Sequence, residues 1–271
     1  MRIGMAQLLV EGGEPERNLQ RAEKLIREAV KEKCDLVLLP ETLDLAWTHP
    51  SAFKEAEPIP GKISDFFCRL AEELKIWLCL GVTEKMNEKR YNAALLIDSE
   101  GKIIHVYHKI NLLEVEFPFY EPGNSLSVVE TVFGNIGLNI CADNYIHSIH
   151  NAHMLARMGA QIILSPSSWT VDHFVTEEMD PYKDKWIKPL QEIARLYDIP
   201  FVSVTSVGYI VGGPYEGKKM IGCSLAVNKE GIIAQGEFNE FAGDLKVVDV
   251  LLKPQKWKGT QFDDLEKNRN K

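Results

Sequence analysis

Cys141 ends an apolar segment, residues 137–140, and is followed at once by the sequence Ala142-Asp143-Asn144. A thiol at the end of a buried strand is held rigidly. The turn after such a strand offers free backbone N–H groups to an oxyanion. The placement of Cys141 therefore suits a nucleophile in acyl transfer, and the plainer alternative is a cysteine that is only buried.

Two charged residues occupy comparable places. Glu41 follows the apolar residues 36–40, and Lys109 follows residues 103–108. Reactive groups at the carboxyl ends of hydrophobic strands are typical of α/β active sites. A carboxylate can take the proton of a thiol, and an ammonium group can stabilise an oxyanion. A surface glutamate or helix cap and a lysine that merely flanks a strand are the alternatives, since no spacing rule links Glu41, Lys109 and Cys141.

The elements that would position these residues follow from hydrophobic periodicity. Helices are predicted over 15–34, 63–74, 149–158 and 181–197. Strands are predicted over 1–10, 36–39, 76–83, 92–97, 103–108, 128–132, 136–140, 162–164, 201–204, 224–227, 232–234 and 246–250. Helix–strand units alternate with hairpins, which favours an α/β fold with mixed sheets.

Composition restricts the function. The 271 residues suffice for one α/β domain, expected over 1–252, with a polar tail or arm over 253–271. The net charge of −8 argues against nucleic acid or an anionic membrane surface as a partner. No apolar stretch approaches the roughly 20 residues of a membrane helix, and no signal peptide is evident. The five cysteines form no CxxC pair, which favours a reducing cytoplasm.

Neither a metal nor an organic cofactor is expected. His147, His150 and His153 recur every three residues, but zinc needs ligand geometry and usually a fourth donor. A solvated or pocket-lining helix is the simpler interpretation of these histidines. The sequence also contains no GxGxxG or P-loop string that would bind a dinucleotide or phosphate.

Three short strings occur in a suggestive order. They are Leu-Leu-Pro-Glu-Thr (38–42), Tyr-His-Lys-Ile-Asn-Leu (107–112) and Leu-Asn-Ile-Cys-Ala-Asp-Asn-Tyr (138–145). In order and approximate spacing they resemble the three signature segments of the nitrilase superfamily, the carbon–nitrogen hydrolases. The resemblance extends from Ile3 to about Val250, and it implies a four-layer α-β-β-α sandwich with two mixed β-sheets.

The resemblance also implies roles for individual residues. Glu41 matches the general base of the family, Lys109 its oxyanion-stabilising lysine, and Cys141 its nucleophile. We expect the backbone N–H of Ala142 to be a further oxyanion donor.

A second glutamate of the family hydrogen-bonds the lysine and helps to position substrate. The Pro-Gly turn at 122–123 nominates Glu116 for this role, with Glu114 and Glu121 as alternatives. Trp169, after the predicted strand 162–164, is a candidate pocket wall or a plain core tryptophan, and the same choice applies to Trp47.

The expected activity is hydrolysis of a small amide or N-carbamoyl compound through a thioester, with release of ammonia or an amine. Hydrolysis of a nitrile is an alternative that the Asp143-Asn144 pair favours. Residues 145–150 lack the Pro-acidic pair of many amidases, which leaves the substrate class open. A catalytically silent binding protein is the alternative of another class. The resemblance implies a homodimer or a larger homo-oligomer.

Overall fold

The structure, a computed structural model, describes residues 1–179, 181–256, 258 and 259. Its α-helices are α1 (Pro15–Lys31), α2 (Ala52–Glu55), α3 (Lys62–Leu74), α4 (His150–Arg157) and α5 (Lys188–Tyr197). Short 3-10 turns are η1 (Glu114–Glu116), η2 (Cys141–Asn144) and η3 (Glu177–Met179), and η4 (Lys183–Ile187) is a π-helix. The strands are β1 (Arg2–Leu9), β2 (Leu36–Leu38), β3 (Trp77–Met86), β4 (Lys89–Ile97), β5 (Ile103–His108), β6 (Val128–Thr131), β7 (Gly134–Leu138), β8 (Ile162–Ser167), β9 (Thr170–Val171), β10 (Phe201–Tyr209), β11 (Lys219–Ile221), β12 (Leu225–Asn228), β13 (Gly231–Gln235) and β14 (Asp244–Asp249).

The strands form two mixed sheets that join along one edge. The first sheet runs in the order β5-β4-β3-β2-β1, with β14 antiparallel to β1. The second sheet contains β6, β7, β8 and β10, with β12 antiparallel to β10 and β13 antiparallel to β12. The sheets meet where Leu8 and Leu9 pair in parallel with Ser206 and Val207.

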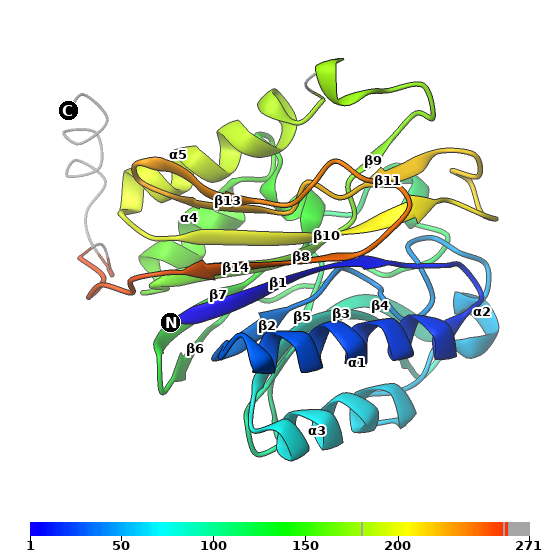
Figure 1. Cartoon of the computed structure of the whole chain (residues 1–271), viewed down its shortest axis with the longest axis horizontal. Coiled ribbons are helices and arrows are strands. Elements are labelled where there is room, and N and C mark those ends of the chain that lie inside the picture. The colour runs from blue at the N-terminus through cyan, green and yellow to red at the C-terminus, as the bar shows by residue number, and fades with distance from the viewer. Residues whose placement is uncertain (180, 257, 260–271) are drawn as a thin grey trace.

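Helices cover the outer face of each sheet (Figure 1). Helices α1 and α3 lie on the first sheet, and α4 and α5 lie on the second. The buried residues of α1 include Ala22, Leu25, Ile26 and Ala29, the spacing of one face of a helix. One apolar cluster fills the space under α1 and α3, and a larger one continues between the sheets to α4 and α5. The predicted four-layer α-β-β-α sandwich is therefore confirmed.

The predicted helix over 181–197 was wrong in one respect, because it is not continuous. A π-helical turn occupies Lys183–Ile187, and α5 begins only at Lys188. Pro189 lacks an N–H and its ring would clash with the carbonyl of residue 185, so it is accepted only in a first helical turn.

The short elements α2, β9 and β11 were not predicted. The predicted tail, 253–271, lies mostly outside the described residues.

Candidate active site

Two strands of the first sheet deliver charged residues to one edge. Glu41 lies three residues beyond the end of β2, and Lys109 follows β5 directly. Strands β2 and β5 run in the same direction, because β2 is parallel to β3 and two antiparallel pairings connect β3 to β5. Gly81 of β3 permits this approach, since a Cβ there would lie 2.5 Å from the Cα of Glu41. The convergence expected for strand ends is therefore observed.

Cys141 comes from the second sheet. It opens the 3-10 turn η2 after β7, and its φ is +41°. A non-glycine residue in this left-handed region is strained, and such strain persists only where the surroundings enforce it. Ala142 is the next residue of the turn. The first N–H groups of a helical turn have no acceptor within it, so the N–H of Ala142 suits an oxyanion donor.

Lys109 lies between two carboxylates and is fully buried with them. Its Nζ is 2.7 Å from Oε1 of Glu41, and 2.9 and 3.0 Å from the two carboxylate oxygens of Glu116. The exposure of these side chains does not exceed 1%. Glu116 thus makes the contact predicted for it, whereas Glu121 pairs with Lys89.

Three further donors hold the carboxylates in place. Trp47 Nε1 donates to Glu116 Oε1 at 2.8 Å, and the backbone N–H of Leu113 donates to Oε2 at 2.8 Å. Asn92 Nδ2 donates to Glu41 Oε1 at 2.6 Å. Sequence reasoning did not find Asn92, because a strand asparagine has no sequence signal that distinguishes this role.

The charges of the cluster act on one another strongly. Burial raises the pKa of Glu41, and Lys109 opposes this shift only in part. Burial alone would lower the pKa of Lys109, but Glu116 and Glu41 raise it well above its usual value. Burial, with the charge of Glu41 added, raises the pKa of Cys141, while Lys109 lowers it. The resting thiol is therefore protonated, and Lys109 carries a positive charge.

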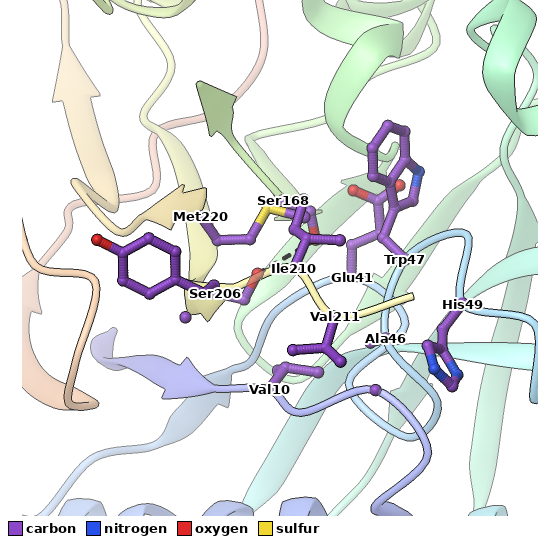
Figure 2. A pocket seen from close by; sticks show the side chains of 13 residues that line it. Val10, Glu41, Ala46, Trp47, His49, Ser168, Ser206, Ile210, Val211 and Met220 are labelled. Carbon is purple, nitrogen blue, oxygen red and sulfur yellow. Dashed lines mark hydrogen bonds between the residues drawn. The ribbon is translucent and has the colours of Figure 1, made fainter. Parts of the chain in front are cut away.

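One oxygen of Glu41 is free to accept a proton. Glu41 Oε2 is buried and has no hydrogen-bond partner among the described residues. Cys141 Sγ lies 3.8 Å from the carbonyl oxygen of Ser168. Glu41 and Ser168 both line one pocket, with Trp47 and Met220 beside them (Figure 2). A buried carboxylate thus lines a cavity next to the turn that carries Cys141.

The two candidate tryptophans lie in different places. Trp47 lines the pocket and holds Glu116. Trp169 is part of the core and stacks on Trp186 with ring centroids 4.7 Å apart. Trp169 is not among the residues that line the pocket beside Glu41, so a substrate contact for it stays a prediction.

Asp143 connects the segments that carry Cys141 and Lys109. Its Oδ2 accepts from Tyr107 Oη at 2.7 Å and from the Ile140 N–H at 3.0 Å. Its Oδ1 accepts from the backbone and side-chain nitrogens of Asn111 at 2.9 and 2.8 Å, and from Asn151 Nδ2 at 3.2 Å. One buried carboxylate thus fixes β5, the loop after Lys109, η2 and α4 relative to one another.

We expect Asp143→Asn to reduce kcat/KM by about 100-fold, the cost of a misplacement near 1 Å. The amide places an N–H opposite the Ile140 N–H and cannot accept from it, so the turn of Cys141 shifts. Steady-state kinetics of amide hydrolysis measure the effect. Tyr107→Phe removes one bond of the same network and is the matched control, with a smaller loss. Wild-type kcat/KM in Asp143→Asn would contradict this positioning role.

Asp44 is a buried carboxyl in the loop between Glu41 and Trp47. Both of its oxygens lie 3.1 Å from the Thr83 N–H. Burial raises the pKa of Asp44 to about 7, although the Thr83 N–H opposes the shift. Between about pH 4 and about pH 7, Asp44 is therefore protonated in the native state but ionised in the unfolded chain.

The stability that Asp44 contributes should therefore be present near pH 4 and should disappear as the pH rises through about 7. We expect Asp44→Asn, which is neutral throughout, to remove this dependence. The free energy of unfolding, measured with urea from pH 4 to 8, should fall in the wild type relative to the variant as the pH rises. Asp65→Asn, at an exposed helical position, should leave the dependence unchanged. Parallel curves for wild type and Asp44→Asn would be the contrary result.

Of the three histidines at 147, 150 and 153, the last contacts helix α5. His153 Nδ1 lies 2.9 Å from Tyr197 Oη. Over the described residues, no group of three or more His, Cys, Asp or Glu side chains could hold a metal ion. No helix within the same residues is long and apolar enough to cross a membrane.

Curated relatives match part of the chain. A nitrilase of Pyrococcus abyssi is 34% identical over 160 residues, which are 57% of this chain and 60% of the relative. An omega-amidase of Xenopus tropicalis is 31% identical over 63% of this chain and 64% of its own length. A human deaminated glutathione amidase is 32% identical over 57% and 52%. The match thus spans less than two thirds of these relatives.

Solved structures share the fold over nearly the whole chain. A carbon-nitrogen hydrolase of Helicobacter pylori G27 superposes with a TM-score of 0.80 at 21% identity, covering 100% of this chain and 92% of the other. A Saccharomyces cerevisiae member of branch 10 of the nitrilase superfamily has a TM-score of 0.76 at 24% identity, covering 100% and 93%. An amidase of Nesterenkonia sp. AN1, solved as a mutant with the acetamide moiety of fluoroacetamide covalently added at its active-site cysteine, has a TM-score of 0.79 at 20% identity over 99% and 96%.

The family model of carbon-nitrogen hydrolases matches residues 2–255, nearly the whole sequence. The match contains all three strand ends that meet at the buried lysine. The chain therefore belongs to the carbon-nitrogen hydrolase family.

Proposed function

We propose that the chain hydrolyses a non-peptide amide bond through a thioester on Cys141. The observation that carries the proposal is Lys109, buried between Glu41 and Glu116 beside a thiol on a strained turn. Amidases among the relatives, and the cysteine adduct of the Nesterenkonia amidase, support this chemistry.

The first half of the reaction forms the thioester. Sγ of Cys141 attacks the amide carbon as Glu41 Oε2 takes the thiol proton. Lys109 and the Ala142 N–H stabilise the tetrahedral oxyanion. Glu41 then gives its proton to the leaving nitrogen, the carbon–nitrogen bond breaks, and ammonia or an amine departs.

The second half releases the acid. Glu41 takes a proton from water, and the resulting hydroxide attacks the thioester carbon. Collapse of the second oxyanion breaks the carbon–sulfur bond, and Glu41 returns the proton to sulfur. A raised pKa suits Glu41 to this alternation between base and acid near neutral pH. Lys109 remains protonated throughout.

Hydrolysis of a nitrile is a second candidate, because one relative is named a nitrilase. The contacts of Asp143 and Asn144 do not favour nitrile hydrolysis over amide hydrolysis. Asp143 holds the backbone of the site, and Asn144 pairs with Asn139 and Ser165. Both residues have structural partners that serve either reaction equally.

The decisive experiment is a panel of small amides, N-carbamoyl compounds and nitriles, assayed for ammonia and carboxylic acid. We expect acid from amides and no acid from nitriles of equal size. Intact-protein mass spectrometry during turnover should detect the acyl adduct. Acid release from nitriles alone would support the nitrilase, and the absence of any adduct or product would favour a silent binding protein.

A further inference from the structure

The turn that carries Cys141 is closed by a pair of asparagine side chains. Asn139 lies two residues before Cys141, and Asn144 lies three residues after it. Asn139 Nδ2 donates to Asn144 Oδ1 at 2.5 Å, and Asn144 Nδ2 donates back to Asn139 Oδ1 at 3.0 Å. Both residues are buried. The reciprocal pair therefore joins the two sides of the turn inside the protein, with Cys141 between them.

The amide pair gives a cause for the backbone conformation of Cys141. Its φ is +41°, and a non-glycine residue keeps such a conformation only where its surroundings enforce it. Each amide supplies one donor and one acceptor to the other, so both polar groups on the shared edge are satisfied. The pair is also neutral, so it adds no charge to the balance among Cys141, Glu41 and Lys109.

Strand β8 anchors the pair. It runs parallel to β7 at its side (Figure 1). The backbone N–H of Asn139 donates to the carbonyl oxygen of Leu164 at 3.3 Å. Asn144 Nδ2 donates to Oγ of Ser165, a fully buried residue, at 2.9 Å. Asn139 is thus fixed to β8 by its backbone, and Asn144 by its side chain.

The end of the same strand contacts the proposed base. The carbonyl oxygen of Ser167 accepts the backbone N–H of Glu41 at 3.3 Å. The carbonyl oxygen of the next residue, Ser168, lies 3.8 Å from Cys141 Sγ. Glu41 comes from the first sheet and Cys141 from the second. The short segment that ends β8 therefore sets the position of the carboxylate relative to the sulfur.

We infer that Asn139, Asn144 and Ser165 are positioning residues, which hold Cys141 Sγ where Glu41 can take its proton. This inference rests on the proposed amide hydrolysis and concerns the geometry of its first step. A general base works only within hydrogen-bond reach of the proton that it takes. A misplacement of about 1 Å lowers the rate by about 100-fold. The three residues act through the backbone of the turn, not on the substrate.

Asn144→Asp tests the pair through a single proton. When neutral, the introduced carboxyl group can donate its O–H to Asn139 Oδ1 and accept from Asn139 Nδ2, so it reproduces the amide pair. When ionised, it cannot donate, and its charge is buried against the oxygen of Asn139. Both effects raise the pKa of the introduced carboxyl above the value of about 3.9 that is ordinary for aspartate.

The expected result is a new ionisation in the activity of the variant. The ratio of kcat/KM in Asn144→Asp to that of the wild type should be close to 1 when the carboxyl is neutral. It should fall by about 100-fold when the carboxyl is ionised. Titratable groups of the wild type, including Cys141, Asp143 and the histidines of α4, cancel in this ratio. Asn139→Asp should give the same profile, because either carboxyl completes the pair only when neutral.

Two rates are measured from pH 5 to 9, at which circular dichroism shows that each variant is folded. One is ammonia release from small amides. The other is alkylation of Cys141 by 2-fluoroacetamide, followed by intact-protein mass spectrometry, which needs no turnover. Both rates in the aspartate variants, divided by those of the wild type, should fall together as the pH rises.

Two further variants separate positioning from general stability. Asn135→Asp makes the same chemical change at the other end of β7, where Asn135 Nδ2 donates to the carbonyl oxygen of Gly159 at 3.2 Å. Its ratio to the wild type should stay close to 1 at every pH. Ser165→Ala removes one hydrogen bond and keeps the amide pair. Its kcat should fall by about fivefold, the effect of one neutral hydrogen bond, with KM unchanged.

A ratio that is independent of pH in both Asn144→Asp and Asn139→Asp would overturn the inference. So would an equal fall in Asn135→Asp, or wild-type kcat in Ser165→Ala, which also decides the matter if the aspartate variants do not fold. Failure of the proposed function is a separate result. It would appear as a wild type that releases no ammonia from any amide, and the alkylation rates would then test the positioning alone.

Discussion

Cys141→Ala should abolish amide hydrolysis while the protein remains folded. The expected loss in kcat is on the order of 10⁶, as for removal of the nucleophile in other acyl-transfer enzymes. The sulfur is nearly buried, with an exposure of 5%. Its removal deletes few contacts, so the free energy of unfolding should change by only about 1 kcal/mol.

The same variant separates nucleophilic chemistry from simple binding. The thiol is protonated at rest, because burial and Glu41 raise the pKa of Cys141. Reaction with 2-fluoroacetamide removes the thiol proton as the carbon–sulfur bond forms and fluoride leaves. Mass spectrometry should find one carbamoylmethyl adduct on the wild type and none on Cys141→Ala.

Cys68→Ala is the matched control. Cys68 lies on helix α3, on the outer side of the first sheet, and is only partly buried. This variant should retain both the adduct and the turnover. Near-normal hydrolysis by Cys141→Ala, or an adduct that disappears in Cys68→Ala, would remove Cys141 from the proposed role.

The strand ends of the site were predictable because the signal is local. Apolar runs before Glu41, Lys109 and Cys141 mark buried strands, and β2, β5 and β7 occupy them. The resemblance to the family then supplied what local patterns lack, namely that these three ends belong to one site. The register of Glu116 likewise depended on the Pro-Gly turn.

The supporting contacts were not predictable in the same way. Asn92 reaches Glu41 because β4 pairs with β3 and β5 in one particular register. Asp143 was considered only as a mark of nitrilases, although its carboxylate joins four segments. Such roles depend on tertiary distances, and neither composition nor periodicity encodes them.

The balance between burial and ion pairing at this site depends on the number of charges that the fold brings together. Burial alone raises the pKa of a carboxyl and lowers that of an ammonium group, and attraction between the two opposes both shifts. Burial is the larger effect on the pKa of Glu41. For Lys109 the attraction is larger and the pKa rises, because Glu116 adds a second carboxylate.

Lys109→Met should therefore damage both catalysis and stability. Loss of an oxyanion donor lowers kcat by about 10²–10³. Loss of the ammonium leaves Glu41 and Glu116 buried without a cation, which costs about 3–5 kcal/mol of unfolding free energy. Methionine fills a similar volume, so a cavity adds little to this cost.

The stability loss should depend on pH in a defined direction. Lys109 lowers the pKa of Glu41, whereas burial and Glu116 raise it. Without Lys109 the pKa of Glu41 rises further, so the folded variant takes up a proton that the unfolded chain releases above about pH 4.3. A raised folded pKa gives stability at low pH that is lost as the pH rises. Urea denaturation should show a larger deficit relative to wild type at pH 8 than at pH 5.

A double variant tests whether the unpaired carboxylates cause the stability loss of Lys109→Met. Adding Glu116→Gln to Lys109→Met removes one of the two orphaned carboxylates. It should recover part of the lost stability at pH 8 but none of the activity, because the oxyanion donor is still missing. Two results would contradict this explanation. The loss of unfolding free energy in Lys109→Met could be the same at every pH, or the double variant could be less stable than the single one. Either result would mean that Lys109 does not stabilise the buried carboxylates in their charged form. The ammonium would in that case serve catalysis alone.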